Sequence, residues 1–177
     1  MSTRVPGRAS RRSGRRRGRG PASAGLLALA LALPLASAAV AQSGLSTIPV
    51  QIAGESFRLE LAADTETMFR GLGGRTQIPV RGGMLFAYPA PRSLAFVMRD
   101  CLVPIDIAFL AADGRVLNLH TMRVEPPRGD DESVAAYEAR LPSYRSSGPA
   151  QYGVEVAGGL LDELGVRPGD RIEFELP

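Results

Sequence analysis

The sequence predicts a mainly β protein: a compact β-sandwich or barrel of jelly-roll-like form, with two or three short helices. Short apolar runs of strand length recur from residue 48 onward. The 20 Gly and 14 Pro in 177 residues supply turn signals between these runs. Only a few short stretches carry apolar residues at helical spacing. Many short strands punctuated by turns are typical of sandwiches and barrels.

The first 41 residues predict a targeting segment that lies outside the fold. An Arg-rich start precedes an apolar run over 25–41, which ends in Ala39-Val40-Ala41. Small residues at the first and third of these positions suit a signal peptidase, and the alternative is an uncleaved anchor. We therefore expect an exported protein that is periplasmic, secreted or attached to the outer face of the membrane. A linker over 42–47 and a single β-rich domain over 48–177 follow.

The charge of the chain is divided unequally. Eight of the 21 basic residues, all of them Arg, lie before residue 20, and all 18 acidic residues lie at or after Glu55. The predicted domain therefore has 13 Arg against 18 acids and a net charge of −5. Such a domain would repel phosphate, so we do not expect nucleic-acid binding. Membrane contact is expected only through an uncleaved leader.

Periodicity and turn residues place the elements in order. Alternation at period two predicts a β-hairpin over 48–61 with its turn at Ala53–Ser56. Asp64 is a good N-cap for a helix that ends at Leu72, before Gly73. Further elements follow to the end of the chain: strands at 83–86, 94–98, 105–110 and 115–122, a polar loop over 123–148 with a helix around 133–141, a strand at 152–156, a helix at 159–164 and a strand at 171–176.

The Asp113-Gly114 pair predicts the register of one hairpin. A two-residue turn at these positions would place Ile107 opposite His120 and Asp106 opposite Thr121. Asp106 and His120 would then point to opposite faces. One face would carry Ile105, Ile107, Phe109, Val116, His120 and Met122, and the other Asp106, Ala108, Leu110, Leu117, Leu119 and Thr121.

An ordered set of short motifs covers residues 48–176. They are Arg70-Gly71-Leu72 with Arg75, Gly82-Gly83-Met84-Leu85-Phe86, Phe96-Val97-Met98-Arg99, Val103 to Phe109, Asp113 to Val116, Ser146 to Ala150 and Gly165 to Asp170. In order and spacing the chain resembles the domain of unknown function 192 (DUF192) family. The resemblance implies a small, often exported protein with a β-rich sandwich or barrel. It brings no established activity.

Asp106 lies within an apolar strand, where an unpaired carboxylate would be costly. The simpler interpretation is a structural ion pair with Arg70, Arg75 or Arg99. The alternative is an acid, a base or a metal ligand.

The other candidates for chemistry are His120, the only His, and Cys101, the only Cys. A lone thiol is more often a packing residue than a nucleophile. Neither residue has partners at a spacing that we recognise as a metal site, so no metal and no cofactor are expected.

Three functions remain open, and the sequence favours a binding module over an enzyme. The first is binding of a small anionic ligand, with Arg70, Arg75 and Arg99 as donors and with Met98, Asp106, Ser146 and Ser147 completing the site. The second is a hydrolase that uses Asp106 or His120. The third is a structural partner in an envelope complex, with the loop over 123–148 as its contact.

Overall fold

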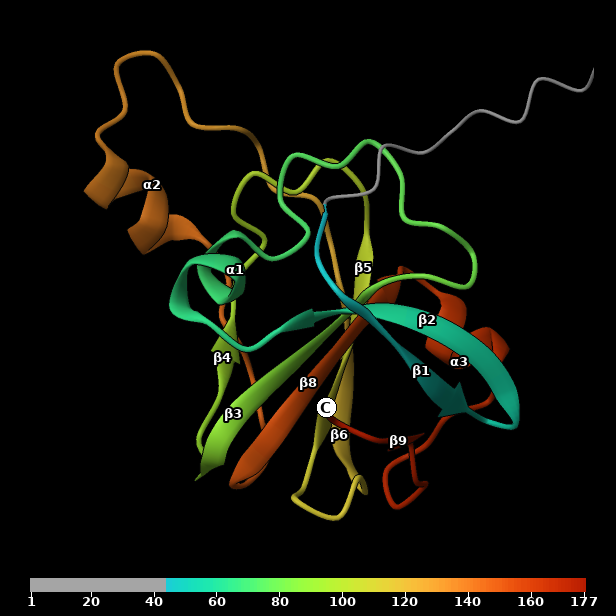
Figure 1. The fold of residues 1–177 in the computed structure, drawn as a ribbon. Coiled ribbons are helices and arrows are strands. Elements are labelled where there is room, and N and C mark those ends of the chain that lie inside the picture. Colours follow the sequence, from blue (N-terminus) through green and yellow to red (C-terminus); the bar gives the residue numbers. More distant parts are fainter. Residues whose placement is uncertain (1–43) are drawn as a thin grey trace, which may run out of the picture. The chain divides into compact units, whose positions relative to one another are not determined.

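A seven-stranded sheet curled into a half-barrel dominates residues 44–177, the part of the chain that the computed structural model describes (Figure 1). Its strands are β1 (Thr47–Ile52), β2 (Glu55–Ala62), β3 (Met84–Arg92), β5 (Ile105–Leu110), β6 (Val116–Met122), β8 (Ala150–Ala157) and β9 (Glu173–Phe174). A second sheet pairs β4 (Ala95–Phe96) with β7 (Tyr144–Arg145). The mainly β prediction is confirmed, and the predicted leader over 1–41 lies outside the described residues.

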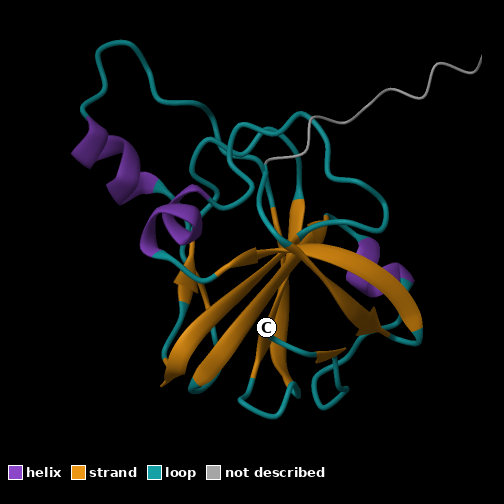
Figure 2. Cartoon of the chain, in the orientation of Figure 1, coloured by secondary structure: helices purple, strands orange, loops and turns teal. Residues whose placement is uncertain are grey.

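Three short helices complete the described part of the chain: α1 (Thr65–Arg70), α2 (Val134–Arg140) and α3 (Leu160–Glu163). Figure 2 shows them at the margins of a structure built mostly of strands. Helix α1 begins at Asp64, whose carboxylate accepts hydrogen bonds from the backbone N–H and the hydroxyl of Thr67 at 2.9 and 2.7 Å. Its last residue is Arg70, and its C-cap is Gly71, which has a positive φ of 52°. The predicted helix and its N-cap are therefore confirmed, but the helix ends two residues before the predicted end at Leu72.

The strands lie in the order β6-β5-β8-β3-β2-β1-β9. All neighbours in this sheet are antiparallel except β2 and β3, which are parallel and joined by the segment that contains α1. Strand β8 is therefore central, with β3 on one side and β5 on the other. An acidic side chain on β8 can be covered by neighbours on both sides.

The two edges of the curled sheet meet at one end. The N–H of Val116, at the start of β6, donates to the carbonyl of Asp170 at 2.8 Å, and the carbonyl of Val116 accepts from Gly169 at 2.8 Å. The N–H of Ile172 donates to the carbonyl of Gly114 at 3.0 Å. We call these three hydrogen bonds the seam. They join β6, at one edge of the sheet, to the segment that precedes β9, at the other edge.

Apolar side chains pack on both faces of the sheet. One cluster contains Ala108 and Leu110 of β5 and Leu161 of α3. The other contains Ile107 and Phe109 of β5, whose side chains point the opposite way. The first face is covered by α3 and the second by α1 and the β4–β7 sheet, which lie at opposite sides of the sheet in Figure 1. A sheet buried on both faces explains why every residue of β5 is buried.

The β5–β6 hairpin has the predicted pairing over most of its length, but its turn differs from the predicted one and a bulge restores the register. Asp106 is opposite Thr121 and Ile107 is opposite His120, as predicted. The turn, however, has three residues between Ala111 and Arg115, with Gly114 at a φ of 81°. A bulge then follows, because the pairing shifts between Phe109 and Leu110. The one extra residue on β6, Leu117, cancels this offset.

The bulge corrects two of the predicted side-chain positions. Val116 packs in the cluster with Ala108 and Leu110, and Leu117 packs against the opposite cluster. The two residues therefore exchange faces relative to the prediction, because the three-residue turn shifts the register between the turn and the bulge by one.

Within residues 44–177, no helix has the length and apolar character needed to cross a membrane.

Candidate functional site

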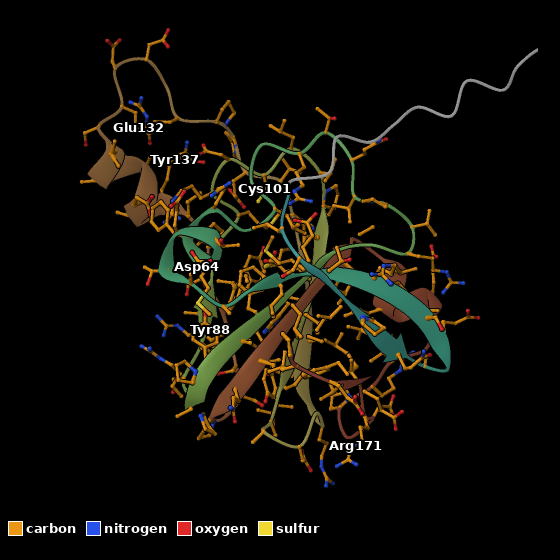
Figure 3. All side chains as sticks on the ribbon, viewed as in Figure 1. Asp64, Tyr88, Cys101, Glu132, Tyr137 and Arg171 are labelled. Atoms are coloured by element: carbon orange, nitrogen blue, oxygen red, sulfur yellow. The ribbon has the colours of Figure 1, made fainter. Side chains whose placement is uncertain are left out.

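A pocket of about 220 Å³ lies between the end of α1, strands β3, β4 and β8, and the loop that follows β4. Two of its residues, Tyr88 and Cys101, are labelled in Figure 3. The lining combines aromatic rings, two Arg and one acid: Met68, Phe69, Arg70, Gly71, Leu72, Phe86, Tyr88, Ala95, Phe96, Val97, Arg99, Cys101 and Glu155.

Glu155 is the buried acid of this pocket. It lies on β8 between Met84 of β3 and Ile107 of β5, and its relative exposure is only 5%. Its Oε2 atom is buried and has no hydrogen-bond partner among residues 44–177. Burial raises the pKa of Glu155 to about 8, and the nearby charge of Arg75 opposes the rise only in part. The group is therefore mainly a neutral carboxylic acid at pH 7.

Gly71 lies beside the Glu155 carboxyl at the pocket. A Cβ at Gly71 would lie 3.8 Å from Glu155 Oε2 and 3.5 Å from Phe86 Cζ. The carboxyl group and the aromatic ring therefore border the same small space. The positive φ of Gly71, 52°, is a backbone conformation that glycine adopts without the strain a side chain would bring.

Aromatic rings form one wall of the pocket. The rings of Phe86 and Phe96 are 4.8 Å apart in an edge-to-face arrangement, and the ring of Phe96 contacts that of Phe109 behind it at 5.6 Å. Phe96 also packs against Gly153, where a Cβ would lie 3.2 Å from its Cζ. The rings are thus fixed by contacts on the sheet, which makes the wall rigid.

Cys101 lines the pocket as an unreactive thiol. Burial, with smaller contributions from the charges of Glu155 and Asp100, raises its pKa to about 12. Burial also raises the pKa of Tyr88 above its usual value. Both groups stay protonated near neutral pH, so neither is an activated nucleophile or base.

Arg70, Arg75 and Arg99 do not converge on one ligand site. Arg70 forms an exposed pair with Glu66 within α1, at 2.9 Å. Arg75 holds Glu60 with two hydrogen bonds, at 2.6 and 2.7 Å.

Arg99 is also held by an ion pair with a carboxylate, in this case one on α2. It forms a two-pronged pair with Glu138, and its guanidinium stacks 4.1 Å from the ring centroid of Phe69. Tyr137 of α2, labelled in Figure 3, accepts a hydrogen bond from the N–H of Asp100 at 3.0 Å. Arg70 and Arg99 therefore line the pocket while each is already paired with a carboxylate.

Asp106 has a structural role that the sequence did not indicate. Its Oδ2 accepts a hydrogen bond of 2.9 Å from the N–H of Leu161, in the first turn of α3. The N-cap of this helix is Gly159, which has no side chain to do the same. The predicted ion pair with an Arg is thus wrong: Asp106 caps α3 from the neighbouring strand, on the face of the sheet opposite Glu155.

His120 and Asp106 do not meet. They lie in adjacent cross-strand pairs and hence on opposite faces of the hairpin. The Nε2 atom of His120 is 3.0 Å from the carbonyl oxygen of Arg145 and 2.9 Å from the side-chain nitrogen of Asn118. Its ring stands between those of Phe109 and Tyr144. The two residues proposed for a hydrolase therefore share no site.

The remaining predicted site residues lie away from the pocket lining. Met98 is buried in the core. The Ser146 hydroxyl accepts from the N–H of Leu94, and the N–H of Ser147 donates to Asn118. Among residues 44–177, no group of three or more His, Cys, Asp or Glu is arranged to hold a metal ion.

Glu155 is the residue that the sequence analysis missed. It stands in Val154-Glu155-Val156, which has the same pattern of an acid inside an apolar strand that singled out Asp106. The pattern could have identified it. Which of the two acids faces a pocket, however, depends on the packing of α1 and α3.

Comparison with known proteins identifies the family. The DUF192 family model, described as an uncharacterized ACR, matches residues 48–174. No curated protein matches the sequence. A crystal structure of a protein of unknown function from Novosphingobium aromaticivorans DSM 12444 is similar, with a TM-score of 0.60 and 33% identity over 74% of this chain and 87% of that one.

A second similar crystal structure comes from Sinorhizobium meliloti 1021 and is described as a candidate transcription regulator. Its TM-score is 0.60, with 27% identity over 75% of this chain and 97% of that one. The family match covers more than half of the sequence, and the first structure shares a third of its residues over most of both chains. The chain therefore belongs to the DUF192 family.

Proposed function

We propose that this domain binds a small organic molecule in the pocket over Glu155. The observation that carries the proposal is the buried Oε2 atom of Glu155, which has no hydrogen-bond partner in the part of the chain that the structure describes. Buried polar atoms are nearly always hydrogen-bonded, because leaving one unpaired costs about 1–3 kcal/mol. A ligand that donates a hydrogen bond here would remove that cost.

The size and walls of the pocket limit the ligand. A volume of 220 Å³ corresponds to roughly seven water molecules at about 30 Å³ each. The rings of Phe86 and Phe96 favour an apolar or aromatic body. The ligand that fits best is therefore small, with one apolar end and one hydrogen-bond donor.

The sequence-based hypothesis is binding of a small anionic ligand. We retain ligand binding but replace the anion by a ligand that donates a hydrogen bond. An anion needs free cationic donors, whereas Arg70, Arg75 and Arg99 each pair with a Glu. An anion in the pocket would also lie close to Glu155. Its negative charge would raise the pKa of that carboxyl group further. A donor ligand has neither difficulty.

Binding is also better supported than hydrolysis. The raised pKa of Glu155 would suit a general acid, but Cys101, beside it in the pocket, has a pKa of about 12 and does not supply a nucleophile. Asp106 and His120 point to opposite faces of their hairpin. Export and a location in the cell envelope stay predictions that rest on the leader.

A fragment screen tests the proposal. Small neutral and charged aromatic fragments are added to the ¹⁵N-labelled full-length chain, and amide shifts are followed by NMR. We expect hits that move the signals of Gly71, Phe96, Cys101 and Glu155 together, since these residues border one pocket.

A matched pair of variants completes the test. Glu155→Gln should weaken the hits, whereas Glu163→Gln, at an exposed position on α3, should leave them unchanged. A screen whose hits all map outside the pocket, or bind equally to both variants, would contradict the proposal.

A further inference from the structure

We infer that the ligand of this pocket is an organic cation, an amine whose ammonium group binds the Glu155 carboxylate while its apolar body lies against Phe86 and Phe96. This inference rests on the proposed function and names the chemical class of the ligand. It follows from the charges around the pocket, from the position of the aromatic wall and from the chemistry of a buried carboxyl group.

The charges around the pocket leave one acid without a partner. Each of the three Arg considered above is matched by its own carboxylate: Arg70 by Glu66, Arg75 by Glu60 and Arg99 by Glu138. Among the described residues, no cation lies within hydrogen-bond distance of Glu155, although the charge of Arg75 reaches it. Once Glu155 ionises, the site has an excess negative charge that a bound cation would balance.

An ammonium group suits this position better than a neutral donor. A hydroxyl group could satisfy Oε2, but it would leave the carboxyl protonated and would gain only a neutral hydrogen bond. An ammonium group donates to a carboxylate in a charge-assisted bond, which is roughly twice as strong as a neutral one. In a buried site with little competing water this difference is larger than on the surface.

The aromatic wall lies next to the Glu155 carboxyl, to which the ammonium group would bind. A Cβ at Gly71 would be within 3.8 Å of Glu155 Oε2 and 3.5 Å of Phe86 Cζ, so the carboxyl group and the ring border the same space beside Gly71. Aromatic rings attract cations through their π-electrons. Phe69 already stacks on a cation, Arg99, at the same pocket. The wall would therefore hold the carbon next to the ammonium nitrogen as well as the body of the ligand.

Binding of an ammonium ion to this site must release a proton. At pH 7 the Glu155 carboxyl is mainly protonated, because its pKa is about 8. The protonated carboxyl and the ammonium ion become a carboxylate–ammonium pair, and the proton passes to the buffer. The other titratable groups that face Glu155 keep their charge between pH 6 and 8: Arg75 stays charged, and Cys101 and Tyr88 stay protonated.

Three probes of similar size separate the chemical classes: benzylamine, benzyl alcohol and benzoate. Their binding to the full-length chain is measured by isothermal titration calorimetry at pH 7 in two buffers that differ in heat of ionisation. We expect benzylamine to bind at least tenfold more tightly than benzyl alcohol and to release about one proton per site. Benzyl alcohol should release none, and benzoate should bind least.

Two variants provide the matched comparison. Glu155→Gln should abolish both the preference for benzylamine and the release of a proton, and Glu163→Gln should retain both. If the first variant does not fold, the proton count on the wild-type chain still decides the question.

Equal affinity for the amine and the alcohol, amine binding without proton release, or binding of none of the three probes would each overturn the inference. The proposed function is judged separately by the fragment screen. A neutral fragment bound over Glu155, combined with no preference for benzylamine, would keep the binding function and exclude the amine.

Discussion

The backbone of Gly83 lies directly against the carbonyl oxygen of Glu155. A Cβ at Gly83 would be only 2.0 Å from that oxygen. The φ of Gly83 is 146°, a value that other residues rarely adopt. Gly83 immediately precedes Met84, the residue of β3 that pairs with Glu155. The glycine therefore lets β3 and β8 come together at the level where the buried carboxyl enters the pocket.

Replacement of Gly83 by Ala should be severely destabilising. The new methyl group can be accommodated only if β3 moves away from β8, because the atom that it meets belongs to the backbone. We expect a loss of more than about 3 kcal/mol in the free energy of unfolding, measured by urea denaturation. Gly148→Ala is the control, since a Cβ there would have no neighbour within 4 Å. Similar denaturation midpoints for the two variants would contradict the close approach.

The buried Glu155 should make the domain less stable as the pH rises. The pKa of this group is raised from 4.5 to about 8 in the folded state, so between these values the unfolded chain is ionised while the folded chain keeps the proton. The unfolded state then binds fewer protons, and stability falls with increasing pH across this window. We expect the free energy of unfolding to be lower at pH 8 than at pH 5 by at least about 2 kcal/mol, since one pKa unit is worth about 1.4 kcal/mol.

The variant Glu155→Gln identifies the source of this pH dependence. It should be more stable than the wild type at pH 8 and should lose most of the difference between pH 5 and pH 8. The paired acids Glu132 and Glu138 have lowered pKa values, so their contribution is lost only as the pH falls below the unfolded value of 4.5. A wild-type chain that is equally stable at pH 5 and pH 8 would show that Glu155 is not buried as a neutral acid.

Loss of the Asp106 side chain should destabilise α3. In Asp106→Ala the N–H of Leu161 loses its buried acceptor, which should lower the free energy of unfolding by about 1–3 kcal/mol. Asp106→Asn keeps an acceptor oxygen and should cost clearly less. Hydrogen exchange gives a local measure, because the Leu161 amide should exchange faster in the Ala variant. Unchanged protection of that amide would exclude the capping role.

The leader should be removed on export. Its apolar run ends in Ala39-Val40-Ala41, and we expect the mature chain to begin at Gln42. Mass spectrometry of the protein from its native host measures this directly. A chain that still begins near Met1 in the membrane fraction would indicate an anchor.

Much of the fold could be predicted from local patterns. The β-rich class, α1 with its Asp64 cap and the pairing of Ile107 with His120 all follow from period, capping and turn residues. The turn itself was predicted wrongly, because Asp113-Gly114 is equally compatible with a three-residue loop that places Gly114 at positive φ. The bulge that restores the register has no sequence signal of its own.

The candidate site could be predicted only in part. Arg70 and Arg99 do line the pocket, but their pairing depends on contacts that sequence patterns do not report. The Arg99–Glu138 pair joins residues 39 apart in sequence, and Arg75 pairs with Glu60 across 15 residues. Glu155 and Asp106 look alike in sequence, as single acids in buried strands. Only the tertiary packing gives one a helix N-terminus and the other a pocket.

The hydrogen bonds along β6 bear on the tendency of the protein to aggregate at high concentration. An exposed strand edge is a template for pairing with another chain, and aggregation begins there. The start of β6 is taken up by the seam, and farther along, Asn118 holds the backbone of Arg145 and Ser147 against the strand while the Ser147 hydroxyl donates to the Leu117 carbonyl. Because these contacts occupy the first part of the edge strand, they protect that part from intermolecular β-pairing.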